Sequence, residues 1–351
     1  MSRRHTVINY VSSGCRKIHP ILFLRVACLL MFAGANIAQA EVPPAPSGYE
    51  TPEATKEAIF SGKIKLVHFN LPVPSSVKVE KGLEYGKGGD VSLQLDLYSP
   101  KEIGTAVPGV LFIHGGSWKG GSREIYHSYC VHFAERGYVA ATVSYRLVDV
   151  APFPAAVEDV KCAVRWMRAN AERLGVDPNQ LAVVGASAGG HLATMVGYSS
   201  DVAELEGDGG HSGISSRVQT VVDFYGPVDL TTDFARDKGP ILDFMGGKRF
   251  EDAKQQYELA SPLTHVTADD PPTLIFHGTI DRIVPIHQSE MLVARLEEEG
   301  IAHEYDPIEG WPHGMDAVEG VNAHCLAKMF EFFDEHLPLP IEEASLGAAS
   351  Q

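Results

Sequence analysis

The stretch Val183-Val184-Gly185-Ala186-Ser187-Ala188-Gly189-Gly190-His191-Leu192 decides the fold of this chain. An apolar strand pattern leads into a Gly-x-Ser-x-Gly turn, and a helical pattern follows the turn. Small residues must flank Ser187, because the backbone doubles back on itself between the strand and the helix. The turn raises the Ser187 hydroxyl above the sheet edge, where the free N–H groups of the first helical turn also point. The stretch therefore predicts a nucleophilic serine beside a site for a developing anion.

Strand and helix patterns alternate through most of the chain. Residues 92–98 alternate polar and apolar side chains, which is typical of a half-exposed strand, and 110–113 form an unbroken apolar run, which is typical of a strand buried on both faces. Helical spacing over 123–136 and 155–174 stops each time at a glycine. Further strands are predicted over 138–144, 181–184, 219–225, 273–277 and 303–306. This order predicts an α/β fold with a mainly parallel central sheet and helices on both faces.

The alternation is interrupted at both ends and once inside the chain. Residues 41–76 are rich in proline and small polar residues, which predicts an N-terminal linker with one short helix near Glu53–Phe60. Residues 228–272 hold glycines, prolines and many charges, and we expect a small cap inserted over the carboxyl edge of the sheet. One catalytic domain then spans 77–340, and 341–351 form a flexible tail.

The first 40 residues have the layout of a secretory signal peptide. They carry five basic residues and no acidic one, and a mostly apolar run over 21–38 ends in the small-x-small sequence Ala38-Gln39-Ala40. Cleavage after Ala40 and a secreted protein, periplasmic or extracellular, are the predictions. The alternative is an N-terminal membrane anchor.

The charge balance excludes some classes of partner. Removing the five basic residues of the leader lowers the number of lysines and arginines from 29 to 24 against 45 acidic residues, a formal charge of −21. Such a negative chain argues against nucleic acid, and against anionic membranes after signal cleavage. No His-Glu-x-x-His, Cys-x-x-Cys or phosphate-binding glycine loop occurs, so neither a metal nor a cofactor is predicted.

A second motif, His114-Gly115-Gly116-Ser117-Trp118, directly follows the buried strand at 110–113. A loop of small residues leaves backbone N–H groups uncovered, so a carbonyl oxygen can approach them closely. In acyl transfer this oxygen becomes an anion, and each fixed donor directed at it contributes about 3–4 kcal/mol. We predict that the N–H groups of Gly116, Ser117 and Ala188 form this oxyanion hole, and that Trp118 contacts the substrate.

An acid and a base follow in later loops. Asp281 lies just past the strand at 273–277, and His313 lies between proline and glycine before the last helix. His313 is predicted to take the Ser187 proton and return it to the leaving group, while Asp281 fixes the histidine tautomer and stabilises the imidazolium. Asp229 also follows a buried strand and is the alternative acid.

Two other histidines near these motifs are interpreted as structural. His114 is expected to support the oxyanion loop, and His277 to be buried in or beside its strand.

The motifs His-Gly-Gly-x-Trp, Gly-x-Ser-x-Gly, Asp-x-x-Val-Pro and Trp-Pro-His-Gly occur in this order, and the chain resembles the α/β-hydrolase superfamily. Within it the chain is similar to bacterial carboxylesterases related to hormone-sensitive lipase, and most similar to the feruloyl/acetyl-xylan esterase-like group. Residues 95–100, 145–147 and 153–160 also fit that group, and the similarity covers about 77–338. Ser117 departs from the third glycine of the lipase-like relatives, which implies a narrower acyl pocket.

The resemblance implies a secreted serine esterase that cleaves short-chain carboxylic esters, with acetylated or feruloylated carbohydrates as possible substrates. An amidase or peptidase related to formamidases or prolyl peptidases is the alternative enzyme, and a catalytically inactive binding protein is the alternative from another class.

Overall fold

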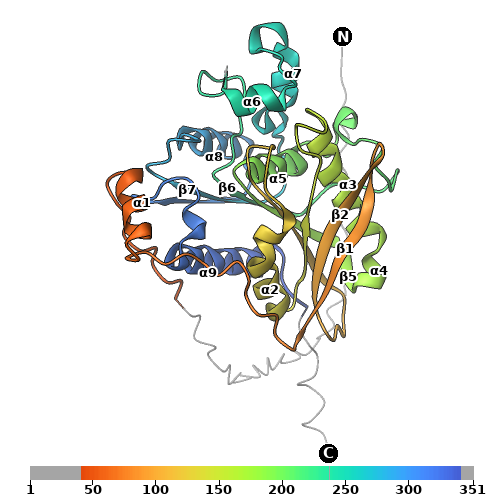
Figure 1. Ribbon diagram of the computed structural model, residues 1–351. Coiled ribbons are helices and arrows are strands. Elements are labelled where there is room, and N and C mark those ends of the chain that lie inside the picture. The colour runs from red at the N-terminus through yellow and green to blue at the C-terminus, as the bar shows by residue number, and fades with distance from the viewer. Residues whose placement is uncertain (1–40, 237, 341–351) are drawn as a thin grey trace, which may run out of the picture. The chain divides into compact units, whose positions relative to one another are not determined.

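The computed structural model describes residues 41–236 and 238–340, and within them eight strands form one sheet (Figure 1). The strand order is β1-β2-β4-β3-β5-β6-β7-β8; the pairs β1–β2 and β2–β4 are antiparallel, and all other neighbours are parallel. The predicted α/β-hydrolase fold with a mainly parallel sheet is thereby confirmed. The strands are β1 (Val77–Gly88), β2 (Val91–Pro100), β3 (Val107–Ile113), β4 (Val139–Val143), β5 (Val176–Ala186), β6 (Thr220–Phe224), β7 (Thr273–Gly278) and β8 (His303–Ile308).

Helices connect the parallel strands and cover both faces of the sheet (Figure 1). They are α1 (Pro52–Phe60), α2 (His127–Arg136), α3 (Ala155–Ala169), α4 (Ala171–Leu174), α5 (Ala188–Tyr198), α6 (Gly239–Phe244), α7 (Lys254–Leu259), α8 (His287–Glu299) and α9 (Glu319–His336). In the described ranges, no helix combines the length and the apolar character needed to cross a membrane. The predicted signal peptide and flexible tail lie outside the described residues.

The core is divided by the sheet, because successive side chains of a strand point to opposite faces. In β3, Leu111 and Ile113 pack with α3 and α5, whereas Val110 and Phe112 pack with α2 and α9. All seven residues of β3 are buried, so this central strand contacts apolar side chains on both faces, as its unbroken apolar sequence predicts.

Residues 41–76, predicted to be a linker, instead pack against the domain. The predicted short helix is present as α1, whose cap is Thr51. Before α1, Trp311 Nε1 donates to the Pro46 carbonyl at 2.8 Å; after α1, Val67 N donates to the Ala317 carbonyl at 2.9 Å. The composition of the segment does not reveal these contacts, because their partners lie more than 200 residues away in the sequence.

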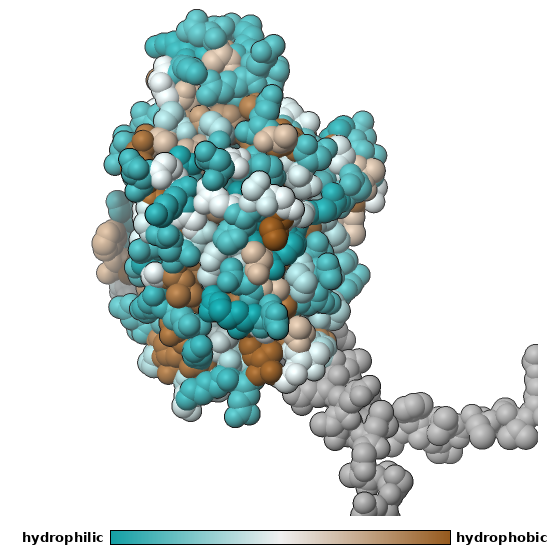
Figure 2. Space-filling view, turned by 90° about the vertical axis from the view of Figure 1, so that its right-hand side faces the viewer, coloured by the Kyte–Doolittle hydropathy of each residue, from teal (hydrophilic) through white to brown (hydrophobic). Residues whose placement is uncertain are grey.

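Residues 228–272 form an insertion that carries α6 and α7, with the exception of Asp237, which is not described (Figure 1). His191 of α5 contacts this segment through its Nε2, 2.8 Å from the Ala260 carbonyl. Ser261 Oγ accepts from Leu230 N at 2.9 Å and thereby ties the two ends of the segment together. On the face shown in Figure 2, the end of the molecule at the top of the view is strongly hydrophilic.

Candidate active site

The carboxyl ends of the parallel strands bring the predicted site residues to one edge of the sheet. The loop with Gly116 follows β3, Ser187 follows β5, Asp281 follows β7 and His313 follows β8. Since β3, β5, β6, β7 and β8 run parallel to one another, these loops meet even though almost 200 residues separate the first from the last.

Ser187 occupies a strained turn between β5 and α5. Its backbone has φ 57° and ψ −120°, in a region that side-chain-bearing residues rarely adopt. Its amide donates to the Phe224 carbonyl of β6 at 2.8 Å, which fixes the turn to the neighbouring strand. A Cβ on Gly189 would lie 2.0 Å from the Ile113 carbonyl oxygen, so only glycine allows α5 to approach β3 this closely.

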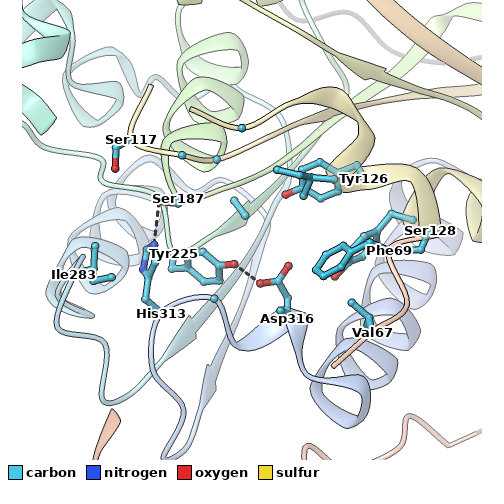
Figure 3. A pocket seen from close by; sticks show the side chains of 18 residues that line it. Val67, Phe69, Ser117, Tyr126, Ser128, Ser187, Tyr225, Ile283, His313 and Asp316 are labelled. Atoms are coloured by element: carbon cyan, nitrogen blue, oxygen red, sulfur yellow. Dashed lines mark hydrogen bonds between the residues drawn. The ribbon is translucent and has the colours of Figure 1, made fainter. Parts of the chain in front are cut away.

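The predicted serine, histidine and aspartate form one hydrogen-bonded chain (Figure 3 shows Ser187 and His313). Ser187 Oγ lies 2.9 Å from His313 Nε2, and His313 Nδ1 lies 2.6 Å from Asp281 Oδ2. With its proton on Nδ1, His313 donates to the carboxylate and leaves Nε2 free to accept the serine proton. This arrangement makes nucleophilic attack by Ser187 chemically possible.

Asp281 is held as a carboxylate by contacts on both oxygens. Oδ1 accepts from the amides of Ile283 at 2.7 Å and Val284 at 3.0 Å, while Oδ2 faces His313 and, at 3.4 Å, Nε2 of His277. Burial by itself raises the pKa of Asp281, but the hydrogen bonds from His277, His313 and the Ile283 amide outweigh it and lower the pKa to about 2. Asp281 is therefore a carboxylate at neutral pH.

The low pKa of Asp281 predicts how the stability of the protein depends on pH. A carboxyl group whose pKa falls on folding stabilises the protein above its ordinary value of 3.8, and this stabilisation is lost as the pH drops through about 2. We expect the free energy of unfolding of Asp281→Asn to fall less steeply between pH 4 and pH 2 than that of the wild type, as measured by urea denaturation. Asp334→Asn, at an exposed ion pair with Arg136, is the control and should keep the wild-type slope. Parallel slopes for Asp281→Asn and wild type would contradict the assignment.

The predicted oxyanion donors surround Ser187. Gly116, Ser117 and Ser187 line one cavity, and Ser117, Ser187 and Ala188 line a second one. The amides of Gly116 and Ser117 donate to no acceptor within the described residues 41–236 and 238–340, and Ala188 begins α5, where amides have no partner inside the helix. A Cβ on Gly116 would lie 2.3 Å from the Gly120 carbonyl oxygen, which explains the glycine at this position.

Trp118, the predicted substrate contact, is almost completely buried. It borders the second cavity, but only 3% of its surface is exposed. Its ring stacks on Phe244 with 4.3 Å between centroids and meets His191 edge-on at 5.0 Å. Trp118 therefore packs the oxyanion loop against α5 and α6, and offers a substrate only a small part of its surface.

The structure separates the rival residues from the chain of Ser187, His313 and Asp281. Asp229 accepts from the amide and hydroxyl of Thr231 at 2.8 and 2.6 Å and is not bonded to His313. His277 is fully buried, with its Nδ1 2.7 Å from Ser289 Oγ. His114 is also buried and stacks on Tyr145, and burial lowers its pKa. Both histidines thus occupy supporting positions.

Two cavities meet at Ser187. The large cavity has a volume of about 490 Å³ and the small cavity about 290 Å³, and Ser117, Ser187 and Ile283 line both of them. His313 lines the large cavity but not the small one. The large cavity extends from Ser187 past Tyr225 to the residues labelled at the right of Figure 3.

Several residues of the large cavity were missed by sequence reasoning. Tyr225 and Asp316 are two of them: the Tyr225 hydroxyl donates to Asp316 Oδ1, and the ring of Tyr225 lies 4.5 Å from that of His313. Tyr225 could have been found, since it directly follows β6 at the same sheet edge. Val67 and Phe69 come from the N-terminal segment and gave no local signal.

Among the described residues, no group of three or more His, Cys, Asp or Glu is placed to hold a metal ion.

A comparison with protein families decides the relationship of this chain. Residues 95–296 match the model of the BD-FAE family. The chain belongs to the BD-FAE family. The BD-FAE region contains the oxyanion loop, Ser187 and Asp281, whereas His313 follows it in the sequence.

Individual relatives of this BD-FAE chain are esterases by name. Esterase LipC of Mycobacterium tuberculosis is 31% identical over 252 residues, which cover 68% of this chain and 62% of LipC. The probable carboxylic ester hydrolase LipM of the same organism is 33% identical over 229 residues, which cover 61% of this chain and 53% of LipM. The chain thus spans less than two thirds of the length of these two relatives.

Solved structures agree with the fold. A truncated carbohydrate esterase from gut microbiota superimposes with a TM-score of 0.67 at 27% identity, covering 76% of this chain and 98% of that one. Propionate-bound esterase 2 of Thermogutta terrifontis gives a TM-score of 0.65 at 28% identity, covering 79% and 100%.

Proposed function

We propose that this BD-FAE protein is a secreted serine esterase that hydrolyses short-chain carboxylic esters through an acyl-enzyme on Ser187. The observation that carries the proposal is the chain of hydrogen bonds from Ser187 through His313 to Asp281, beside the free amides of the oxyanion loop. The esterase names of the relatives support the same reaction.

The geometry suggests the proton transfers. Ser187 Oγ attacks the ester carbon while His313 Nε2 takes its proton, and the carbonyl oxygen becomes an anion within reach of the Gly116, Ser117 and Ala188 amides. His313 then returns the proton to the alcohol oxygen as the carbon–oxygen bond breaks. In the second half, His313 Nε2 takes a proton from water as the water oxygen attacks the acyl carbon. The bond between this carbon and Ser187 Oγ then breaks, the carboxylic acid leaves, and His313 returns the proton to Ser187 Oγ.

The position of His313 supports one orientation of the ester in the two cavities. The leaving alcohol receives its proton from His313 Nε2 in this proposal, which favours the large cavity, lined by His313, for the alcohol. The acyl group then occupies the small cavity, next to Ala188.

This assignment brings the acyl group next to the cap. The cap sequence as a whole is acidic and polar, which by itself would suit a hydrated neighbour. Among the cap residues that the structure describes, 228–236 and 238–272, those that line the small cavity are mostly apolar, with Lys238 as the charged one: Phe234, Lys238, Pro240 and Ile241. The acidic residues of these two ranges do not line the cavity, and its inner wall suits an acyl chain.

We expect acyl preference to be set by the walls of the small cavity. Ester series from acetyl to decanoyl should give the highest kcat/KM for acyl groups no longer than butyryl. Ile241→Ala should raise the hexanoyl-to-acetyl ratio of kcat/KM by about 10-fold, because it removes apolar wall atoms that limit chain length. Ile125→Ala, which alters only the large cavity, is the matched control and should leave the ratio unchanged. A wild-type maximum at octanoyl or longer would contradict this assignment.

Secretion is supported by the basic, apolar and small-residue layout of residues 1–40. Mass spectrometry of the exported protein is expected to find Glu41 as the first residue. Membrane-bound protein that retains the intact leader would support the anchor instead.

A further inference from the structure

The oxyanion loop has a backbone conformation that needs support from outside the loop. Ser117 and Trp118 both have φ 55°, in the left-handed region that side-chain-bearing residues rarely adopt. Such a conformation persists only where the surrounding structure holds it. The Gly116 carbonyl accepts from two amides of the same loop, and the Trp118 carbonyl accepts from Val148 N at 2.9 Å. These bonds leave the Gly116 and Ser117 amides free, so side-chain packing must help to hold them in place.

The Trp118 side chain joins the loop to the cap. Its ring stacks on Phe244, the last residue of α6, with an angle of 18° between the ring planes. Within residues 41–236 and 238–340, the buried Trp118 Nε1 has no hydrogen-bond partner, so ring contacts hold the indole in place. The neighbouring residues Lys119 and Asp243 form an ion pair at 2.9 Å, but both are exposed and such pairs contribute little. Phe244 is therefore the main support that the cap gives to the loop.

Phe244 also contacts the helix that supplies the third oxyanion donor. His191 lies on α5, three residues after Ala188. Its ring meets Phe244 edge-on at 5.3 Å and Trp118 edge-on at 5.0 Å. Phe244 itself is only 1% exposed, and its carbonyl accepts from the Phe153 amide at 2.8 Å. One fixed side chain of the cap thus packs on residues of both elements that form the oxyanion hole.

We propose that Phe244 is a positioning residue of the oxyanion hole. Through Trp118 it keeps the Gly116 and Ser117 amides directed at the carbonyl oxygen of the ester. The proposal rests on the proposed function, since these amides act only if an oxyanion forms. Phe244 lines neither of the two cavities at Ser187, so its replacement alters the support of the loop and not the walls that contact the ester. A movement of α6 away from Trp118 removes this support, which links the position of the cap to the rate of the chemical step.

Nitrophenyl acetate and the matching thionoester, in which sulfur replaces the carbonyl oxygen, test the positioning role. Sulfur accepts hydrogen bonds weakly, so the thionoester gains little from the amides of the oxyanion hole. We expect wild-type kcat/KM to be at least about 100-fold higher for the acetate. Phe244→Ala should lower kcat/KM for the acetate by about 10-fold, because the amides are displaced but not removed. The thionoester should change by less than about 3-fold, so the ratio of the two values falls.

Phe250→Ala is the matched control, because Phe250 is another aromatic residue of the cap and its ring meets Tyr257 edge-on at 5.5 Å. It should change kcat/KM for either ester by less than about 3-fold. Phe244→Leu keeps an apolar side chain without a flat ring, and it decides the test if Phe244→Ala shows no cooperative thermal unfolding. Phe244→Leu should lower the acetate-to-thionoester ratio by about 5-fold.

Equal losses on both esters in the Phe244 variants would overturn the positioning role, because a general structural defect does not distinguish oxygen from sulfur. The same loss of ratio in Phe250→Ala would also overturn it. If the wild type hydrolyses no ester, or hydrolyses both equally fast, the proposed function itself fails. If the wild type strongly prefers the acetate and the Phe244 variants keep this preference, only the positioning role fails.

Discussion

Replacing Ser187 with alanine is expected to lower kcat for ester hydrolysis by about 10⁵- to 10⁶-fold, because the variant has no nucleophile to form the acyl-enzyme. The Ser187 side chain is small and its backbone strain arises from the turn, so Ser187→Ala should still fold and bind ester. Nitrophenyl acetate hydrolysis measures the loss, and competitive inhibition by a substrate-like ketone without a leaving group measures retained binding.

The matched control for this variant is Ser61→Ala, at the exposed end of α1. It removes the same atom far from the proposed nucleophile and should keep full activity. A Ser187→Ala variant with more than about 1% of wild-type kcat would mean that another group attacks the ester.

Asp281→Asn is expected to lower kcat by about 10⁴-fold, because an amide at this position favours the wrong tautomer of His313 and cannot stabilise the imidazolium. Asp229→Asn is the matched control, since both acids follow parallel strands at the same edge, but Asp229 bonds Thr231 instead of His313. It should keep kcat within about 3-fold of the wild type, because it removes no catalytic contact.

Combining the variants of Ser187 and Asp281 tests whether Ser187, His313 and Asp281 act together in catalysis. Ser187→Ala with Asp281→Asn should be no slower than Ser187→Ala alone, because the three residues act as one unit. Full activity in Asp281→Asn together with its loss in Asp229→Asn would reverse the assignment of the acid.

The sheet and the positions of the proposed catalytic residues could be predicted from sequence for one physical reason. Parallel strands end at a common edge, and glycine or proline marks the loops that follow them. Ser187, Asp281 and His313 each lie in such a loop, so recognising the strand before each residue was enough to bring them together. Asp229 lies in such a loop as well, and the hydrogen bonds of the structure, Asp229 to Thr231 and Asp281 to His313, separate the two acids.

The walls of the cavities could not be predicted in the same way. Val67 and Phe69 come from a proline-rich segment whose position depends on partners such as the Trp311 indole and the Ala317 carbonyl, far away in sequence. The burial of Trp118 likewise depends on Phe244, which an irregular insertion supplies. Local patterns report strands and turns, whereas substrate walls are made by long-range packing.

Covalent labelling tests most directly the central claim that Ser187 is the nucleophile. The wild-type protein is treated with an organophosphonate ester, and the adducts are located by peptide mass spectrometry while esterase activity is followed. We predict one adduct per chain, on the peptide that contains Ser187, with activity lost in proportion to labelling and no labelling of Ser187→Ala. An adduct on another residue that accompanies the loss of activity, or complete labelling of Ser187 with activity retained, would contradict the account.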